Sequence, residues 1–178
     1  MQLYLIRHPE PRDGRGLCYG RLDLGVDPQA IARTAGALRQ RLPAWVLQTA
    51  PIYTSPLSRC TALAQALASP RNAIVAAELV EMDFGSWEGR RWDAVPREEL
   101  DRWAEDVWGY RPGGVESALD VAARWRQWLE RIGHDGDAAI AVTHAGVIRV
   151  ALAQGEARAP TEWAQVEIEF GSHVELRA

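Results

Sequence analysis

The heptapeptide Ala138-Ala139-Ile140-Ala141-Val142-Thr143-His144 decides the fold that we expect of this chain. Its first five residues are all apolar, a pattern typical of a strand that is buried on both faces of a parallel sheet. Residues 146–154 continue with the pattern of a helix. In folds built from such strand–helix units, ligands bind just beyond the carboxyl ends of the strands. The polar pair Thr143-His144 therefore marks a candidate site.

Outward from this stretch, the chain alternates short apolar runs with amphipathic segments. The pattern predicts strands over residues 3–6, 51–55 and 73–76, helices over residues 27–42, 57–67, 97–107 and 117–132, and a terminal hairpin that joins residues 166–170 to residues 173–177. Such alternation favours an α/β fold, a three-layer sandwich in which a mainly parallel sheet carries helices on both faces. A chain of 178 residues is expected to form one domain over residues 1–178.

The charged residues exclude several classes of chemistry. The chain has 20 Lys and Arg residues against 24 Asp and Glu residues, and all 20 cations are arginine. Schiff-base, lysine-nucleophile and P-loop mechanisms are excluded because each of them needs a lysine amine. The formal net charge of −4 favours neither nucleic acid nor a membrane surface as a partner.

Cysteine usage and hydropathy indicate a protein of the cytoplasm. Cys18 and Cys60 are too few for a disulfide framework, and neither lies in a CxxC pair or beside a histidine. The longest apolar run, residues 138–153, is interrupted by polar residues and is shorter than the ~20 residues of a membrane span. Residues 1–8 lack the features of a signal peptide. We therefore expect a cytoplasmic chain without a membrane partner.

Two histidines and two arginines lie at the ends of predicted strands or close beyond them. His8 follows the first strand, and His144 follows the strand at residues 138–142. Each could be a nucleophile, a general base, a metal ligand or a histidine that only completes a hydrogen bond. Arg7 precedes His8 and Arg59 opens a predicted helix, where it could also be merely exposed. Because a guanidinium binds phosphate oxygens bidentately, the set predicts a phosphoryl pocket in which an imidazole attacks phosphorus.

A metal site is the alternative explanation of the two histidines at the strand ends. It needs further ligands, for which His134 in a predicted loop and His173 in the terminal hairpin are the candidates. Since a metal needs this third and fourth ligand in addition to the two histidines, we expect no metal.

Expulsion of an alkoxide needs a proton donor, and residues 81–89 (Glu-Met-Asp-Phe-Gly-Ser-Trp-Glu-Gly) hold three carboxylates. A carboxyl close to the apolar rings of Phe84 and Trp87 would have its protonated form favoured. Glu81 is the first candidate for the donor and Asp83 is the second. For Glu88, a solvated position in an acidic loop is a serious alternative.

Four segments, taken in this order, resemble the motifs of the histidine phosphatase superfamily, also called phosphoglycerate mutase-like. They are residues 5–10 (Leu-Ile-Arg-His-Pro-Glu), 54–60 (Thr-Ser-Pro-Leu-Ser-Arg-Cys), 81–89 and 143–149 (Thr-His-Ala-Gly-Val-Ile-Arg). The resemblance implies a phosphoglycerate mutase-like fold and a phosphomonoesterase that needs no metal or organic cofactor. It implies that His8 is the nucleophile that becomes phosphohistidine and that Glu81 is the proton donor. The remaining members of the phosphate pocket would be Arg7, Arg59 and His144.

Two positions depart from the family pattern. Pro9 follows the first histidine where many members have glycine, and proline restricts His8 to the extended backbone of a strand end. Residues 112–117 (Pro-Gly-Gly-Val-Glu-Ser) carry one residue more than the usual Pro-Gly-Gly-Glu-Ser. The insertion weakens any substrate role for Glu116, whereas Ser117 still suits a helix cap.

Within the superfamily, residues 18–23 (Cys-Tyr-Gly-Arg-Leu-Asp) and 81–89 look most similar to those of the α-ribazole phosphatases. Those enzymes dephosphorylate α-ribazole 5′-phosphate during assembly of the lower nucleotide of cobalamin. The resemblance implies that Tyr19 stacks on a planar group and that Arg21 adds a cation near the phosphate. The alternative for both residues is a packed loop over the sheet edge. Asp83 and Trp87 are also predicted to contact the substrate.

Other functions are compatible with the same residues. A general sugar- or metabolite-phosphate phosphatase is the main alternative, followed by a phosphoglycerate mutase and a non-catalytic binder of phosphorylated ligands. The chain looks too short for the insertion that covers the site of a mutase, and a binder typically lacks one of the histidines or arginines. The expected partner is a small-molecule phosphomonoester, and a homodimer is left open.

The sequence contains eight tryptophans, some expected in the core and others expected at the pocket. Trp125 and Trp128 lie on a predicted helical stripe and are expected in the core. Four others, at positions 87, 92, 103 and 108, cluster in the segment that would cover the pocket. One or two of these four are expected to line an apolar wall for a ring-bearing substrate, and the sequence does not say which.

Overall fold

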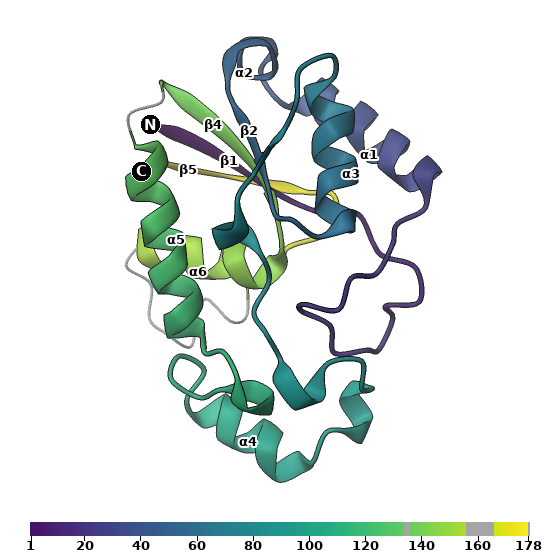
Figure 1. The fold of residues 1–178 in the computed structure, drawn as a ribbon, viewed down its shortest axis with the longest axis vertical. Helices are drawn as coiled ribbons and strands as arrows, with labels where there is room; N and C mark the ends of the chain where they lie inside the picture. Colours follow the sequence, from purple (N-terminus) through teal and green to yellow (C-terminus); the bar gives the residue numbers. More distant parts are fainter. Residues whose placement is uncertain (134–135, 156–165, 178) are drawn as a thin grey trace.

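Strand β4 (Ala138–Thr143) lies at the centre of a five-stranded sheet in the computed structural model, which describes residues 1–133, 136–155 and 166–177 (Figure 1). The strand order is β3-β2-β4-β1-β5. The other strands are β1 (Gln2–Arg7), β2 (Ile52–Thr54), β3 (Ile74–Val75) and β5 (His173–Arg177). All neighbouring pairs are parallel except β1 and β5, which are antiparallel. The expected mainly parallel sheet is confirmed.

Alternating side chains of the central strands feed two separate cores. On β1, Leu3 and Leu5 point to one face of the sheet, and Tyr4 and Ile6 point to the other. All six residues of β4 are buried, which explains why this strand reads as one apolar run.

Helices cover both faces of this sheet (Figure 1). Helices α1 (Pro28–Arg41) and α3 (Ser58–Ala68) pack on the face of Tyr4 and Ile6, and the short α2 (Ala44–Thr49), which the sequence pattern did not predict, adds Val46 to that core. Helices α5 (Ala118–Ile132) and α6 (Ala145–Gly155) pack on the face of Leu3 and Leu5. The three-layer sandwich is confirmed.

Two helices begin at the caps that the sequence indicates. The Asp27 side chain accepts a hydrogen bond from the backbone N–H of Gln29, and Pro28 occupies the first turn of α1. Ser117 caps α5 through a reciprocal capping box with Asp120. Trp125 and Trp128 of α5 are buried in the core, as expected.

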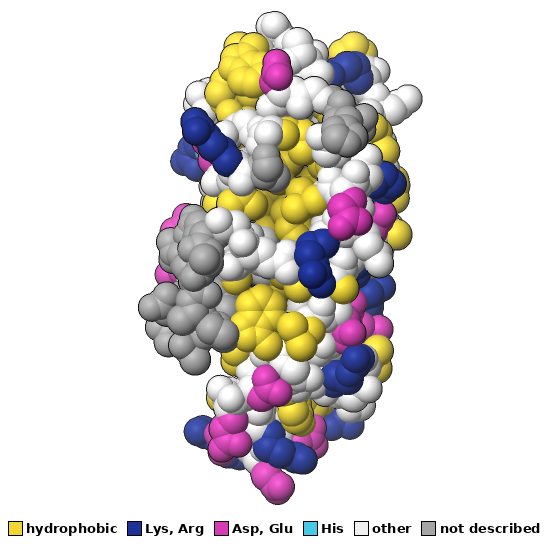
Figure 2. Space-filling model, turned by 90° about the vertical axis from the view of Figure 1, so that its left-hand side faces the viewer, with side chains coloured by type: hydrophobic (Ala, Val, Ile, Leu, Met, Phe, Trp, Pro, Cys, Tyr) yellow, Lys and Arg dark blue, Asp and Glu magenta, His cyan; other side chains and the backbone are white. Residues whose placement is uncertain are grey.

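The segment between β3 and α5 forms most of the end of the molecule that lies away from the sheet (Figure 1). It contains α4 (Arg97–Glu105) and four short 3₁₀ turns, η1 (Ala77–Leu79), η2 (Gly85–Trp87), η3 (Trp92–Ala94) and η4 (Pro112–Gly114). Figure 2 shows that charged side chains gather at this end, whereas apolar side chains lie along the middle of the face it draws. The inner side of the segment carries the aromatic residues discussed below.

The predicted terminal hairpin is wrong. Residues 173–177 form β5, but residues 166–170 form no strand, and β5 pairs with β1 instead. The reason lies in two arginines. The side chain of Arg7 donates to the backbone oxygen of Ile168, and Arg149 Nε donates to that of Val166 at 2.9 Å. These two carbonyls are therefore bound to guanidinium groups and do not pair with a strand.

Trp163 and His134, which the sequence analysis considered, lie outside the described residues.

Candidate active site

The parallel strands deliver His8, Ser55 and His144 to one edge of the sheet. The strand register pairs Arg7 with Thr143 on the two neighbouring strands β1 and β4. It pairs Thr54 of β2 with Val142 of β4. The residue after each strand therefore lies at the same carboxyl edge, where α3 and α6 also begin.

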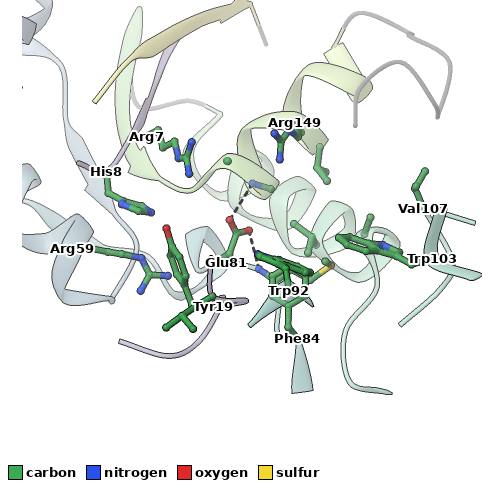
Figure 3. Close-up of a pocket in the computed structure, with 17 residues that line it drawn as sticks. Arg7, His8, Tyr19, Arg59, Glu81, Phe84, Trp92, Trp103, Val107 and Arg149 are labelled. Atoms are coloured by element: carbon green, nitrogen blue, oxygen red, sulfur yellow. Dashed lines mark hydrogen bonds between the residues drawn. The ribbon is translucent and has the colours of Figure 1, made fainter. Parts of the chain in front are cut away.

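A cavity of about 280 Å³ opens at this edge. Figure 3 shows its two ends: Arg7, His8, Arg59 and Tyr19 gather at one end, and Trp103 and Val107 lie at the other, with Glu81 between them. Further lining residues are Leu17, Met82, Phe84, Trp92, Ala118, Val121, Ala145, Gly146, Arg149 and Val150.

The His8 imidazole is neutral and held in one tautomer. Its Nδ1 lies 2.7 Å from the backbone oxygen of Pro9, and because a carbonyl can only accept, Nδ1 carries the proton. Burial lowers the pKa of His8 to about 3, helped by the charges of Arg59 and Arg7 and opposed by the bond to Pro9. Nε2 therefore keeps its lone pair for chemistry.

His144 lies behind His8 and does not line the cavity. The two ring centroids are 5.1 Å apart in an edge-on arrangement, and His144 is fully buried. His144 Nε2 lies 2.8 Å from Ser55 Oγ and 3.5 Å from Cys60 Sγ. Burial lowers the pKa of His144 well below its ordinary value, and the nearby His8 and Arg59 lower it further.

These two histidines predict an acid-sensitive fold. Below pH 6.5 the unfolded chain binds protons that the folded His8 and His144 do not bind, so the free energy of unfolding falls as pH falls. Each histidine contributes a loss of about 1.4 kcal/mol per pH unit, which for His8 continues down to its folded pKa. Urea unfolding at pH 7, 6 and 5 measures the slope. In His8→Asn the slope should be smaller than in the wild type; an unchanged slope would contradict the assignment.

Arg59 and Arg7 both leave a buried donor without a partner. Arg59 is fully buried, and its two terminal nitrogens donate to the backbone oxygens of Leu22 at 2.8 Å and Gly20 at 2.6 Å. Among the residues that the structure describes, the Nε atoms of Arg59 and Arg7 have no hydrogen-bond partner. Since buried N–H groups are nearly always satisfied, two such donors beside His8 suit an anion that completes their bonding.

Glu81 is the one carboxylate among the described lining residues. It accepts hydrogen bonds from the backbone N–H groups of Met82 at 3.0 Å and Gly146 at 3.1 Å, the latter in the first turn of α6. A Cβ atom at Gly146 would come within 2.4 Å of the carboxylate, so only glycine allows this approach. The carboxylate is thereby fixed between the two ends of the cavity.

Tyr19 closes the polar end of the cavity. Its ring lies 5.3 Å from the Arg59 guanidinium carbon. Burial raises the pKa of Tyr19, although Arg7 and Arg59 oppose the shift, so the hydroxyl stays protonated and can donate. The described residues contain no cluster of three His, Cys, Asp or Glu side chains that could hold a metal ion.

Comparison with known proteins settles the family. The family model described as "Histidine phosphatase superfamily (branch 1)" matches residues 3–178. The chain belongs to this superfamily.

Several relatives of this histidine phosphatase carry names. The "Bifunctional protein Rv2228c" of Mycobacterium tuberculosis is 39% identical over 85% of the chain, which spans only 43% of that relative. "Phosphoserine phosphatase 1" of Hydrogenobacter thermophilus is 29% identical over 84% of the chain and 73% of its own length. The crystal structure of the α-ribazole phosphatase from Shigella flexneri superposes with a TM-score of 0.81 at 22% identity, covering 98% of this chain and 89% of that one, and so shares the fold.

Three residues predicted to bind substrate do not line the cavity of this histidine phosphatase. Arg21 Nε donates to the backbone oxygen of Glu81 at 2.9 Å, and its terminal nitrogen lies 3.5 Å from Glu116. Asp83 accepts from the backbone N–H of Gly85, the first residue of the 3₁₀ turn η2. Trp87 is fully buried, and its indole N–H donates to Glu99. The polar groups of Arg21, Asp83 and Trp87 are therefore bonded to other parts of the protein outside the cavity.

Glu88 is not a solvated loop residue. Its carboxylate accepts from the backbone N–H groups of Gly20, Arg21, Leu22 and Phe84 at 2.9–3.0 Å. The carbonyls of Gly20 and Leu22 in turn receive Arg59. Glu88 thus holds residues 20–22 in place, and the carbonyls of this loop bind the buried Arg59.

Replacement of Glu88 by glutamine is expected to lower the free energy of unfolding by about 2–3 kcal/mol, because several charge-assisted bonds are lost and an NH₂ group faces N–H donors. Urea unfolding measures the change. The control is Glu98→Gln, whose side chain is 86% exposed and which should lose little. Equal losses in the two variants would refute the anchoring role.

The cavity also contains residues to which the sequence assigned no definite role: Arg149 was only a possible cation for the phosphate, and Trp92 and Trp103 were two of four candidates for an apolar wall. Arg149 lies on the face of α6 that includes Ala145, Gly146 and Val150, all of which line the cavity. The helical spacing of these positions could have identified Arg149 as a lining residue. Trp92 and Trp103 line the apolar end in place of Trp87. They come from η3 and α4, and no periodicity links them in sequence.

No helix among the described residues has the length and hydropathy to cross a bilayer.

Proposed function

We propose that this phosphatase works through a phosphohistidine formed at Nε2 of His8. The observation that carries the proposal is the bond between Nδ1 and the Pro9 carbonyl, which leaves Nε2 unprotonated beside Arg7 and Arg59. In the first step, Nε2 forms a bond to phosphorus while the ester P–O bond breaks. The leaving alkoxide takes a proton from the Glu81 carboxyl group. In the second step, water attacks phosphorus, Glu81 accepts its proton, and phosphate leaves His8.

The neighbouring side chains have supporting roles in this scheme. The guanidinium groups of Arg7 and Arg59 bind the equatorial oxygens of the transferring group through their free donors. Tyr19 adds a neutral hydroxyl donor at the same end. His144, packed edge-on against His8 from outside the cavity, fixes the position of the His8 ring.

Trapping of the intermediate tests the scheme. Rapid quenching during turnover of a ³²P-labelled monoester in the presence of a chelator should yield a phosphoenzyme that is stable to base and labile to acid, as a phosphohistidine is. Turnover without any such species, or turnover that the chelator abolishes, would contradict the proposal.

For the substrate, we propose α-ribazole 5′-phosphate. The support is the similarity of residues 18–23 and 81–89 to those of the α-ribazole phosphatases, together with an aromatic cavity wall that suits a planar base. A panel of phosphomonoesters should give the highest kcat/KM with α-ribazole 5′-phosphate. A higher value with another metabolite would replace it.

A broad-specificity metabolite phosphatase is the second candidate. The phosphoserine phosphatase relative favours it, and Arg149 in the cavity could pair with a substrate carboxylate. The same panel separates the candidates, since a broad enzyme would show similar kcat/KM values across it. Conversion of 3-phosphoglycerate to 2-phosphoglycerate without phosphate release would instead indicate a mutase. Failure to hydrolyse p-nitrophenyl phosphate, with His8→Ala behaving like the wild type, would indicate a non-catalytic binder.

From the sequence we also propose a cytoplasmic location, and we leave a homodimer open. Cell fractionation and analytical ultracentrifugation test them.

A further inference from the structure

The cavity has two chemically different ends, and Glu81 lies between them (Figure 3). The polar end holds His8 and the guanidinium groups of Arg7 and Arg59. Trp103 and Val107 lie at the opposite end, and the other apolar lining residues include Met82, Phe84, Trp92 and Val121. If phosphorus lies beside His8 and the ester oxygen beside Glu81, the leaving group extends to the apolar end.

Trp92 and Trp103 stack on each other and form an aromatic wall at this end. Their ring planes differ by only 9°, and their centroids are 6.1 Å apart. Trp87 stands edge-on behind both indoles, at centroid distances of 6.4 and 5.8 Å. Because Trp87 is fully buried and bonded to Glu99, the wall is supported from behind and formed before a ligand binds.

Charge is scarce at this end. Among the described lining residues beyond Glu81, the only charged side chain is Arg149, and its Nε already donates to the backbone oxygen of Val166. A leaving group that carries an ammonium or several hydroxyls would lose hydration against the indoles without regaining hydrogen bonds. A planar apolar ring would instead stack on them.

We propose that Trp92 and Trp103 form an aromatic subsite that binds a planar, uncharged ring on the leaving group of the phosphomonoester. The inference rests on the proposed phosphohistidine function, which sets the position of phosphorus. It makes the aromatic wall, rather than Arg21 or Trp87, the part of the cavity that selects the substrate.

The test compares kcat/KM for three phosphates of primary alcohols: 2-(1-naphthyl)ethyl phosphate, glycerol 3-phosphate and O-phosphoserine. All three release a primary alkoxide, so a difference reports recognition of the leaving group. The wild type should prefer the naphthyl ester over each of the others by on the order of 30-fold. A preference below about threefold overturns the subsite.

Variants locate the preference. Trp103→Leu should lower the ratio of kcat/KM for the naphthyl ester to that for glycerol 3-phosphate about tenfold. A purely structural role would lower both values together and leave the ratio unchanged, which would overturn the proposal. Trp45→Leu is the matched control, because Trp45 is 49% exposed on α2 and outside the cavity. If Trp103→Leu does not fold, Val107→Asp carries the same test, since it places a charge at the apolar end and should also reduce the ratio.

Failure of the subsite and failure of the proposed function are distinguishable. Similar turnover of all three esters through a phosphoenzyme overturns the subsite alone. Turnover without a phosphoenzyme overturns the function on which the subsite rests.

Discussion

Replacement of His8 by alanine or asparagine is expected to lower kcat for any phosphomonoester by about 10⁵-fold. The reason is that in the proposed mechanism Nε2 of His8 supplies the electron pair that displaces the alcohol, and none of the described lining residues offers a second imidazole or thiol. His144, the nearest other imidazole, is fully buried and faces Ser55. Steady-state release of phosphate from p-nitrophenyl phosphate measures the loss.

Binding should survive this substitution. Arg7 and Arg59 keep their donors in the variants, so inorganic phosphate should still protect the folded protein against thermal unfolding. His173→Asn is the control for loss of a histidine, because His173 lies on β5 outside the cavity. An His8→Ala variant that retains a phosphoenzyme and more than about a hundredth of the wild-type kcat would rule out His8 as the nucleophile.

Replacement of Arg59 by lysine is expected to lower kcat/KM about 10³-fold. Arg59 uses two nitrogens to hold the carbonyls of Gly20 and Leu22 and leaves Nε for the phosphoryl group. A lysine ammonium is a single point of charge and cannot reach the loop carbonyls and the phosphate in the same geometry. The conservative replacement is therefore expected to fail.

Thermal shift with phosphate separates the two roles of Arg59. At a concentration 100 times its Kd, phosphate should stabilise the wild type by about 2.7 kcal/mol, and the Arg59→Lys variant much less. Arg97→Lys, whose side chain is 86% exposed, should behave like the wild type in both assays. If Arg59→Lys lost stability but kept its response to phosphate, Arg59 would serve only to hold the loop.

The sheet and its reactive edge could be predicted because they depend on local patterns. Successive side chains of a strand point to opposite faces of the sheet, so the apolar run at residues 138–142 is buried on both faces. The apolar residues of β1 contribute to the two cores in the same alternating way. Once both are parallel strands, their carboxyl ends must coincide, which brings His8 and His144 within 5.1 Å between ring centroids.

The residues that line the cavity beyond this edge could not be predicted in the same way. Arg21 turns to Glu116, which lies 95 positions later in the chain, and no local pattern records that attraction. Residues 166–170 alternate like a strand but give two carbonyls to Arg7 and Arg149. Among similar tryptophans, the sequence does not distinguish Trp87, which faces the core, from Trp92 and Trp103, which face the cavity.

By itself, then, the sequence determined a mainly parallel sheet with His144 directly after the strand Ala138–Thr143, since strand burial and the residue after a strand are local properties. Only the tertiary structure decided which nitrogen of His8 is free, which donors of Arg7 and Arg59 lack partners, and which indoles form the wall. Apart from the bond between His8 and the adjacent Pro9, those features depend on contacts between segments distant in the chain, made by 3₁₀ turns and loops whose side chains follow no period.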